Sequence, residues 1–192
     1  HLEHRRQRQM CIRDSNNVGI YSSKSFFETS IETWQEQFQV NLMSGVALSK
    51  YYLKGMLDRN WGRILFISSE CAYLVPPDMI SYSTTKASMH AVSRGLALLT
   101  KGTGVTSNVI VPGSTLTKGA KTFLADKAKE HDTSPEAIEK DFFNNNRTSS
   151  LLKRFASTDE VATTIAYLCS PLSSATNGSV IKVDGGSSGG IL

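Results

Sequence analysis

Short strand-like runs alternate along the chain with longer stretches in which apolar residues recur at helical spacing. Residues 64–67 form a continuous apolar run and residues 105–111 are rich in β-branched residues, which is typical of parallel strands buried on both faces. Residues 179–183 predict a shorter last strand. This alternation predicts an α/β fold, in which ligands bind at the carboxyl ends of the strands.

Three helices are predicted from apolar residues spaced three and four positions apart. One surrounds and follows residue 82 and ends at Gly102 and Gly104. The other two begin at capping-box patterns, at residues 29–32 and 157–160. The apolar stripes of the three helices are Met89, Val92, Leu96 and Leu99; Leu42, Val46, Leu53, Met56 and Leu57; and Val161, Ile165 and Leu168.

Composition narrows the class of protein. The 192 residues suit one domain with a sizeable core, and no apolar run is long enough to cross a membrane. Half of the formal charge of +4 belongs to the first fifteen residues, where four arginines face two acidic residues. We therefore expect no nucleic-acid partner. The three scattered cysteines, Cys11, Cys71 and Cys169, indicate a reducing, cytoplasmic location without a disulfide framework or a metal site.

Tyr82 and Lys86 carry the most informative chemistry. On a helix they form an i, i+4 pair on one face, and a nearby ammonium favours the phenolate, so we expect Lys86 to lower the pKa of Tyr82 towards the range useful for acid/base work. Ser69, at the end of the preceding predicted strand, supplies a hydroxyl that can hold a substrate oxygen. The alternative is a chance pair on a solvated helix face.

Six landmarks in order make the chain resemble the classical short-chain dehydrogenase/reductase family, including its 3-oxoacyl-ACP-reductase-like members. The resemblance extends from about residue 16 to residue 186 and implies a Rossmann-like, doubly wound parallel sheet. The landmarks are Asn16-Asn17-Val18-Gly19, where the family usually has Ala in place of Val18; Val40-Asn41; Ile67-Ser68-Ser69; the Tyr82/Lys86 pair; Pro112-Gly113-Ser114-Thr115-Leu116-Thr117; and Val183-Asp184-Gly185-Gly186.

The resemblance implies that Asn41, Ser69, Tyr82 and Lys86 are a catalytic tetrad acting with NAD or NADP. Tyr82 would give a proton to the carbonyl oxygen, Ser69 would orient the carbonyl, and Lys86 would also hold the nicotinamide ribose. Asn41, at a local break in its helix, would anchor a water; the alternative is an ordinary helix-interior residue. The resemblance also implies the cofactor-binding residues Asn17, Val18, Gly19, Tyr82, Lys86, Pro112, Gly113, Thr115 and Thr117.

Residues 1–15 do not fit the resemblance. They contain no glycine-rich turn, and residues 9–15 are too polar for the central strand that should precede Asn16. We therefore expect a non-native leader joined to a truncated domain at residues 16–192, lacking its first strands and glycine-rich turn. A natural basic arm is the alternative.

Residues 114–150 show no strand pattern and lie where the family has its substrate lid. A helix begins at residues 133–136, with Pro135 at the favoured first position. The apolar residues of this segment form either a roof over a hydrophobic substrate or ordinary helix packing: Phe123, Leu124, Ile138, Phe142 and Phe143.

Two classes of function remain open. The first is an oxidoreductase that transfers a hydride between a nicotinamide cofactor and a carbonyl or alcohol substrate, without membrane or nucleic-acid partners. By the resemblance, the helices around residues 46–57 and 82–99 would pair such an enzyme into a homodimer or homotetramer. The second is a non-catalytic fragment that keeps only these oligomerisation helices. A pseudoenzyme is a third, weaker alternative.

Overall fold

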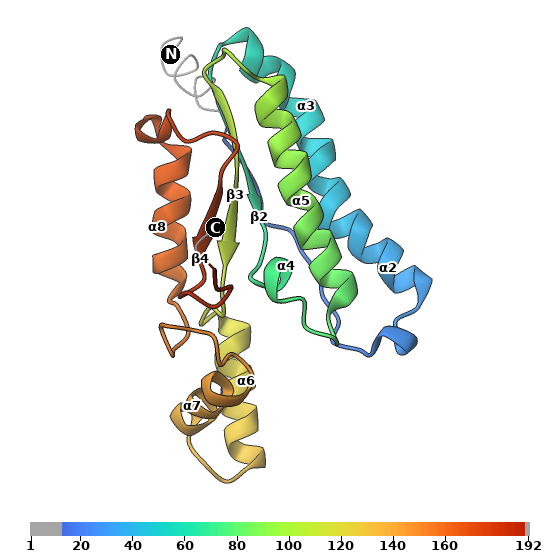
Figure 1. The fold of residues 1–192 in the computed structure, drawn as a ribbon, viewed down its shortest axis with the longest axis vertical. Helices are drawn as coiled ribbons and strands as arrows, with labels where there is room; N and C mark the ends of the chain where they lie inside the picture. Colours follow the sequence, from blue (N-terminus) through green and yellow to red (C-terminus); the bar gives the residue numbers. More distant parts are fainter. Residues whose placement is uncertain (1–12, 191–192) are drawn as a thin grey trace, which may run out of the picture.

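A parallel four-stranded sheet organises the computed structural model, which describes residues 13–190 (Figure 1). The strands lie in the order β1 (Arg13–Asn16), β2 (Gly62–Ile67), β3 (Val105–Pro112) and β4 (Val180–Val183), and all neighbours are parallel. Every residue of β2 is buried, as expected for a central strand covered on both faces. The predicted α/β fold with a parallel sheet is confirmed.

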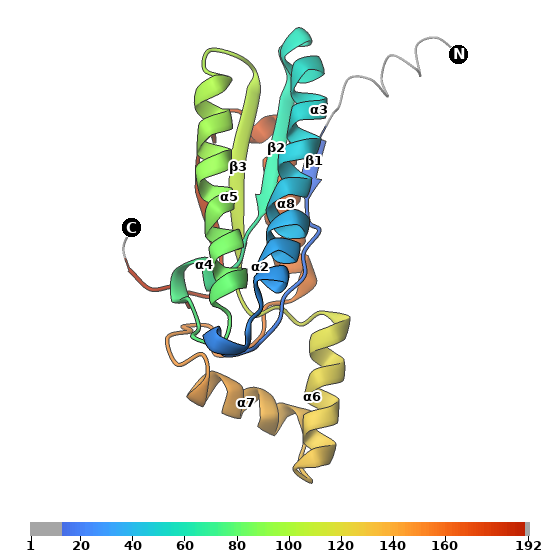
Figure 2. The ribbon, with the colours of Figure 1, turned by 90° about the vertical axis from the view of Figure 1, so that its right-hand side faces the viewer.

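Helices cover both faces of the sheet (Figures 1 and 2). α3 (Ser44–Asp58) and α5 (Ile80–Leu99) pack on one face, and α8 (Thr158–Cys169) packs on the other. The first face holds a cluster that includes Leu53, Met56, Ile64, Phe66, Met89 and Val109, and the second a cluster that includes Leu65, Ile67, Ile110 and Leu168. The doubly wound arrangement is therefore present in the described residues, and none of their helices is long and apolar enough to cross a bilayer.

The polar stretch before Asn16 contains a strand that was not predicted. β1 pairs with β2, with Arg13 opposite Arg63 and Asn16 opposite Phe66. The prediction that residues 9–15 are unsuited to a strand is wrong for residues 13–15, because pairing uses backbone groups and β1 is the outermost strand of the described sheet, where polar residues are tolerated. Residues 1–12 of the expected leader lie outside the described residues.

The helix that carries Asn41 is interrupted as predicted. α2 (Ile31–Gln37) passes into a π-helical turn, η2 (Phe38–Met43), before α3 begins. The N-cap of α2 is Ser30, which accepts from the Thr33 amide, one residue beyond the expected cap. The capping box of α8 is confirmed: Ser157 and Glu160 bond reciprocally at 3.1 and 2.7 Å.

Residues 114–150 contain α6 (Lys118–Glu130) and α7 (Pro135–Asn145), which extend beyond one end of the sheet (Figure 2). Leu124, Phe143 and Phe155 form their buried cluster, with Ile138 and Phe142 packed against it. The remaining short elements are η1 (Phe26–Glu28), α4 (Cys71–Leu74) and η3 (Pro171–Ser173).

Candidate active site

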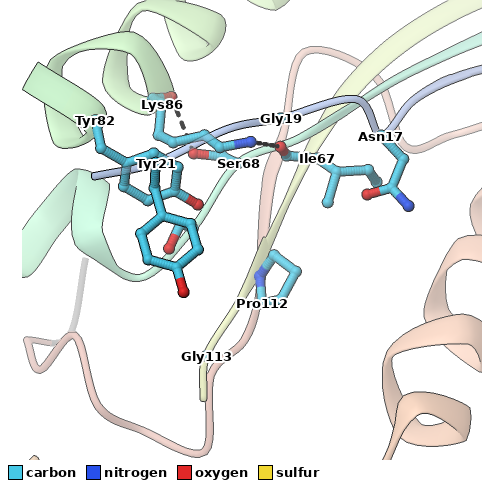
Figure 3. A pocket seen from close by; sticks show the side chains of 10 residues that line it. Asn17, Gly19, Tyr21, Ile67, Ser68, Tyr82, Lys86, Pro112 and Gly113 are labelled. Atoms are coloured by element: carbon cyan, nitrogen blue, oxygen red, sulfur yellow. Dashed lines mark hydrogen bonds between the residues drawn. The ribbon is translucent and has the colours of Figure 1, made fainter. Parts of the chain in front are cut away.

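A cavity of about 250 Å³ lies at the carboxyl ends of β2 and β3 (Figure 3). This is the edge at which open α/β sheets bind ligands, because the strand ends and the loops that follow them converge there. The cavity joins the chain segment after β1 to the first turns of α5. Its lining residues are Asn17, Gly19, Tyr21, Ile67, Ser68, Ser69, Tyr82, Lys86, Pro112 and Gly113.

Tyr82 and Lys86 lie on one face of α5, as predicted. The Lys86 Nζ is 5.5 Å from the centroid of the Tyr82 ring and donates a 2.9 Å hydrogen bond to the Ile67 carbonyl at the end of β2 (Figure 3). This bond fixes a buried ammonium at the sheet edge. Since an ammonium has three donors, and the Ile67 carbonyl is its one hydrogen-bond acceptor among the described residues, it retains donors for a ligand.

The pKa of Tyr82 is raised to about 12, so the prediction that Lys86 lowers it is wrong in this structure. Burial is the main cause, because it disfavours the phenolate, and the Ser69 hydroxyl beside the ring opposes the shift without overcoming it. Burial also lowers the pKa of Lys86 to about 8. Tyr82 is therefore a protonated phenol at neutral pH, which suits a proton donor.

Ser68 and Ser69 directly follow β2 and make different hydrogen bonds. The Ser69 Oγ accepts a 3.2 Å hydrogen bond from the Cys71 amide, and its hydroxyl also interacts with the Tyr82 phenol. Ser68 is buried and donates 2.9 Å from its Oγ to the Lys86 carbonyl (Figure 3), while its Oγ also lies 2.9 Å from the His90 Nε2. Ser68 thus ties the end of β2 to α5, a role that the alternation of side chains along an extended strand could have indicated.

Asn41 lies behind the cavity instead of lining it. Its Oδ1 accepts from the Ile20 amide at 2.7 Å, and its Nδ2 donates to the Ile20 carbonyl at 2.9 Å and to the Thr85 Oγ1 at 3.0 Å. The π-helical turn places this side chain, which is 1% exposed, between two segments of the site. Asn41 therefore fastens the loop after β1 to α5.

The predicted cofactor residues divide into two groups. Asn17, Gly19, Pro112 and Gly113 line the cavity with Tyr82 and Lys86. The other three do not: Val18 is largely exposed, the Thr115 Oγ1 donates to the Gly113 carbonyl at 2.9 Å, and Thr117 caps α6 by accepting from the Ala120 amide.

The cavity fits a group rich in hydroxyls, such as a ribose. A side chain at Gly19 would begin 3.4 Å from the Lys86 Nζ and 3.5 Å from the Asn41 Oδ1, so glycine keeps the approach to the ammonium open. The exposed Asn17 adds an amide at the same rim. Among the described residues, no cluster of three His, Cys, Asp or Glu side chains is placed to hold a metal ion.

A second cavity, of about 650 Å³, lies between the helices α6 and α7 and the first cavity. Tyr21 lines both cavities, and its ring meets that of Tyr82 edge-on with centroids 6.0 Å apart. Tyr21 was not among the predicted site residues, and only its closeness to the Asn17–Gly19 landmark could have suggested it. Nor was Arg147, which lines the larger cavity and pairs with Glu70.

Comparisons with known proteins agree with this fold. The sequence profile of a family described as enoyl-(acyl carrier protein) reductase matches residues 15–188. The chain is 42% identical over 171 residues to the uncharacterized oxidoreductase YvrD of Bacillus subtilis, an alignment that covers 89% of this chain and 65% of that protein.

Two further relatives carry more specific names. The chain is 32% identical to the 3-oxoacyl-[acyl-carrier-protein] reductase FabG of Aquifex aeolicus, with 89% of the chain and 63% of that protein covered. The L-sorbose reductase of Gluconobacter frateurii, solved with NADPH and L-sorbose, superposes with a TM-score of 0.86 at 27% identity, over 93% of this chain and 67% of that one. The chain thus spans about two thirds of these proteins.

Proposed function

Because the chain belongs to the short-chain dehydrogenase/reductase family, we propose that the protein carrying it is an oxidoreductase that acts with NAD or NADP on a carbonyl or alcohol substrate. The observation that carries the proposal is the meeting of Tyr82, Lys86 and Ser69 in one cavity at the carboxyl edge of the sheet. When bound, the dinucleotide supplies or accepts the hydride.

Tyr82 is the proposed proton donor in the reducing direction. Burial keeps its phenol protonated, and a proton delivered to the carbonyl oxygen neutralises the negative charge that develops there. In the oxidising direction the same group must first lose its own proton before it can accept one from the alcohol, and its raised pKa disfavours that loss. Ser69 is the proposed group that orients the carbonyl, because its hydroxyl lines the cavity beside Tyr82 and its Oγ is held by the Cys71 amide.

Lys86 is the proposed anchor for the nicotinamide ribose. Its remaining donors face the cavity beside Gly19, and Asn17, Pro112 and Gly113 complete the contact surface. Val18, Thr115 and Thr117 remain proposed contacts at the edges of the cofactor. For Asn41 we propose an indirect part in proton transfer, through the loop and helix that it joins and through a water held at the π-helical turn.

The larger cavity is the proposed substrate site, with residues 114–150 as its lid. Phe123, Phe142 and Phe155 supply apolar walls, and Tyr21 connects this space with the Tyr82 hydroxyl. The aromatic cluster that holds α6 to α7 supports the lid. A ketone or aldehyde with an apolar body fits this arrangement.

We also propose a cytoplasmic homodimer or homotetramer formed through α3 and α5. Large apolar side chains on these helices remain exposed, namely Leu48, Tyr51, Leu98 and Leu99, and such surfaces mark association sites. The cytoplasmic location rests on the scattered cysteines of the sequence.

Titration of the purified protein with NADH and NADPH, followed by nicotinamide fluorescence, tests the proposal. We expect saturable binding, and oxidation of the reduced cofactor when an apolar ketone is added. Lys86→Met should weaken cofactor binding, whereas Lys54→Met, on the exposed side of α3, should not. If the protein binds neither cofactor but still self-associates through α3 and α5, the non-catalytic alternative replaces the proposal.

A further inference from the structure

A partly buried ion pair stands in the wall of the larger cavity. The Arg147 Nε lies 2.9 Å from the Glu70 Oε1, and the side chains are 18% and 4% exposed. Glu70 directly follows Ser69, whereas Arg147 follows the end of α7, 77 residues away in sequence. The pair therefore joins the lid to the segment that carries the proposed catalytic serine.

The carboxylate of Glu70 depends on Arg147 for its charge balance. Its Oε1 accepts one further hydrogen bond, from the Ser114 Oγ at 3.0 Å, while the Oε2 is buried without a hydrogen-bond partner among the described residues. Removing a carboxylate from water is strongly unfavourable unless a cation compensates it. The positive charge of Arg147 is therefore largely neutralised from behind by Glu70.

This neutralisation sets the charge of the cavity. Arg147 and Asp78 are the only charged side chains that line it among the described residues, and their charges are opposite. With Glu70 behind Arg147, the sum of the three is negative. The remaining walls are mainly apolar, with Pro76, Met79 and the aromatic rings of the lid.

We infer that the Glu70–Arg147 pair makes the cavity selective for uncharged carbonyl substrates with an apolar body, and that Glu70 excludes substrates bearing a carboxylate. This inference rests on the proposed function. A substrate carboxylate beside Arg147 would compete with Glu70 for the same guanidinium and meet the repulsion of two carboxylates.

The guanidinium still offers a neutral contact. Its Nη1 donates to the Asn146 carbonyl at 3.0 Å, and its central carbon lies 5.5 Å from the centroid of the Phe142 ring. These contacts hold its plane in place, and no hydrogen bond engages its Nη2 within the described part of the chain. Arg147 can therefore donate to an ester or hydroxyl oxygen, which gives the cavity a polar contact without net attraction for anions.

A matched substrate pair tests the inference: the methyl ester of para-carboxybenzylacetone and its free carboxylate, which share the same ketone. Calorimetry with the oxidised cofactor present, where the ketone is not reduced, gives the affinity of each compound, and initial rates with the reduced cofactor give kcat/KM. We expect the native protein to favour the ester by about tenfold or more, a difference of about 1.4 kcal/mol. Glu70→Gln, which keeps the size of the side chain and removes the charge, should shift the ratio towards the carboxylate by about tenfold.

Further variants separate charge from structure. Arg147→Gln in the Glu70→Gln background should return the ratio towards the ester, since no cation then remains at the wall. Asp78→Asn should shift the ratio towards the carboxylate by only about threefold, because this residue is exposed and screened. Glu70 is next to Ser69, so replacing it also affects the overall activity. Because such a change acts on both substrates alike, it cancels in the ratio of their kcat/KM values.

The outcomes are distinct. A native preference for the carboxylate, or an unchanged ratio in Glu70→Gln, overturns the inference and leaves the proposed function standing. Binding of the ester in preference to the carboxylate without any turnover supports the inference about the cavity and counts against the proposed function. Failure to bind either compound overturns both the inference and the assignment of the cavity as the substrate site.

Discussion

α5 and the lid helices are built on different principles. α5 lies against the sheet and buries seven residues, five of them polar or charged. α6 and α7 together bury only Leu124, Ala128 and Phe143, and their cluster with Phe142 and Phe155 is held by ring contacts 5.1–5.3 Å between centroids. The two regions meet at the site, so the site combines polar side chains of the sheet-packed helix with an aromatic cluster of the lid helices.

The difference concerns how strictly geometry is fixed. The buried face of α5 is specified by directional bonds, such as Ser93 to Ser107 at 2.9 Å, Ser68 to the Lys86 carbonyl, and Asn41 to Thr85. Satisfied buried polar networks specify a single arrangement, whereas apolar contacts tolerate repacking of similar volume. The sheet side thus fixes the proposed reacting groups, and under the proposed function the lid helices can adapt to substrates of differing shape.

Removing the Tyr82 hydroxyl should have the largest effect on the sheet side. Tyr82→Phe keeps the ring contact with Tyr21 but removes the proposed proton donor, and we expect kcat/KM to fall by about 10³-fold, with cofactor affinity little changed. Initial rates and fluorescence titration measure the two quantities. Tyr167→Phe, on the exposed side of α8, is the control, and retained turnover in Tyr82→Phe would contradict the proposed chemistry.

Truncating one phenylalanine in each region compares their contributions directly. Phe66→Ala in β2 should lower the free energy of unfolding by about 4 kcal/mol, since the ring is fully buried in the sheet core. Phe143→Ala in the lid should lower it by about 3 kcal/mol or less and mainly raise KM. Denaturant unfolding and steady-state kinetics give both values. A Phe143→Ala protein with reduced kcat and native KM would show that the lid also fixes the reacting groups.

The buried ammonium predicts a pH-dependent stability. The pKa of Lys86 falls from 10.5 to about 8 on folding, so between these values the unfolded chain binds more protons and stability rises with pH. The Lys86→Met protein has no ammonium to titrate at this position, so its free energy of unfolding does not rise in this way. The free energy of unfolding of the variant minus that of the native chain should therefore be greatest near pH 7 and smaller by up to about 3 kcal/mol near pH 10. Denaturant unfolding of both proteins across this range measures it; a pH-independent difference would contradict the burial effect.

The smallest expected difference is between two helix caps. Ser157→Ala removes the capping box of the sheet-packed α8 and should lower the free energy of unfolding by about 1 kcal/mol. Ser134→Ala removes the single side-chain cap of α7 and should act mainly by local opening of the lid. Amide hydrogen exchange should therefore increase in α7 more than in the rest of the chain. An even increase throughout the protein would mean that the lid unfolds only with the sheet.

The sequence was most informative where local pattern and tertiary structure agree. Residues 64–67 and the helix after Tyr82 were predicted because burial on both faces and helical periodicity leave clear marks. β1 was missed because backbone pairing at the outer position requires no apolar side chains. The Glu70–Arg147 pair joins residues far apart in sequence, so no local spacing could indicate it.

The positions of the predicted site residues followed from the sequence better than their pKa shifts did. The Tyr82/Lys86 spacing placed both side chains correctly, but the direction of the Tyr82 pKa shift depends on burial, which spacing does not report. Tyr21 lies in the site because of the path of the loop after β1. Asn41, on the π-helical turn, holds this loop by two hydrogen bonds to the backbone of Ile20. Such placements depend on the assembled structure.

The π-helical turn at Phe38–Met43 has a consequence for how this chain can vary in length. A π-turn accommodates one residue more than the regular helix would hold, and each residue of a helix rotates its neighbours by about 100°. Deleting one residue here would restore a regular helix but turn Asn41 away from Ile20 and Thr85, or else rotate α2 relative to α5. Homologous chains that share this site should therefore accept insertions and deletions in the loops on either side of α2 and α3, and keep the length of this helix constant.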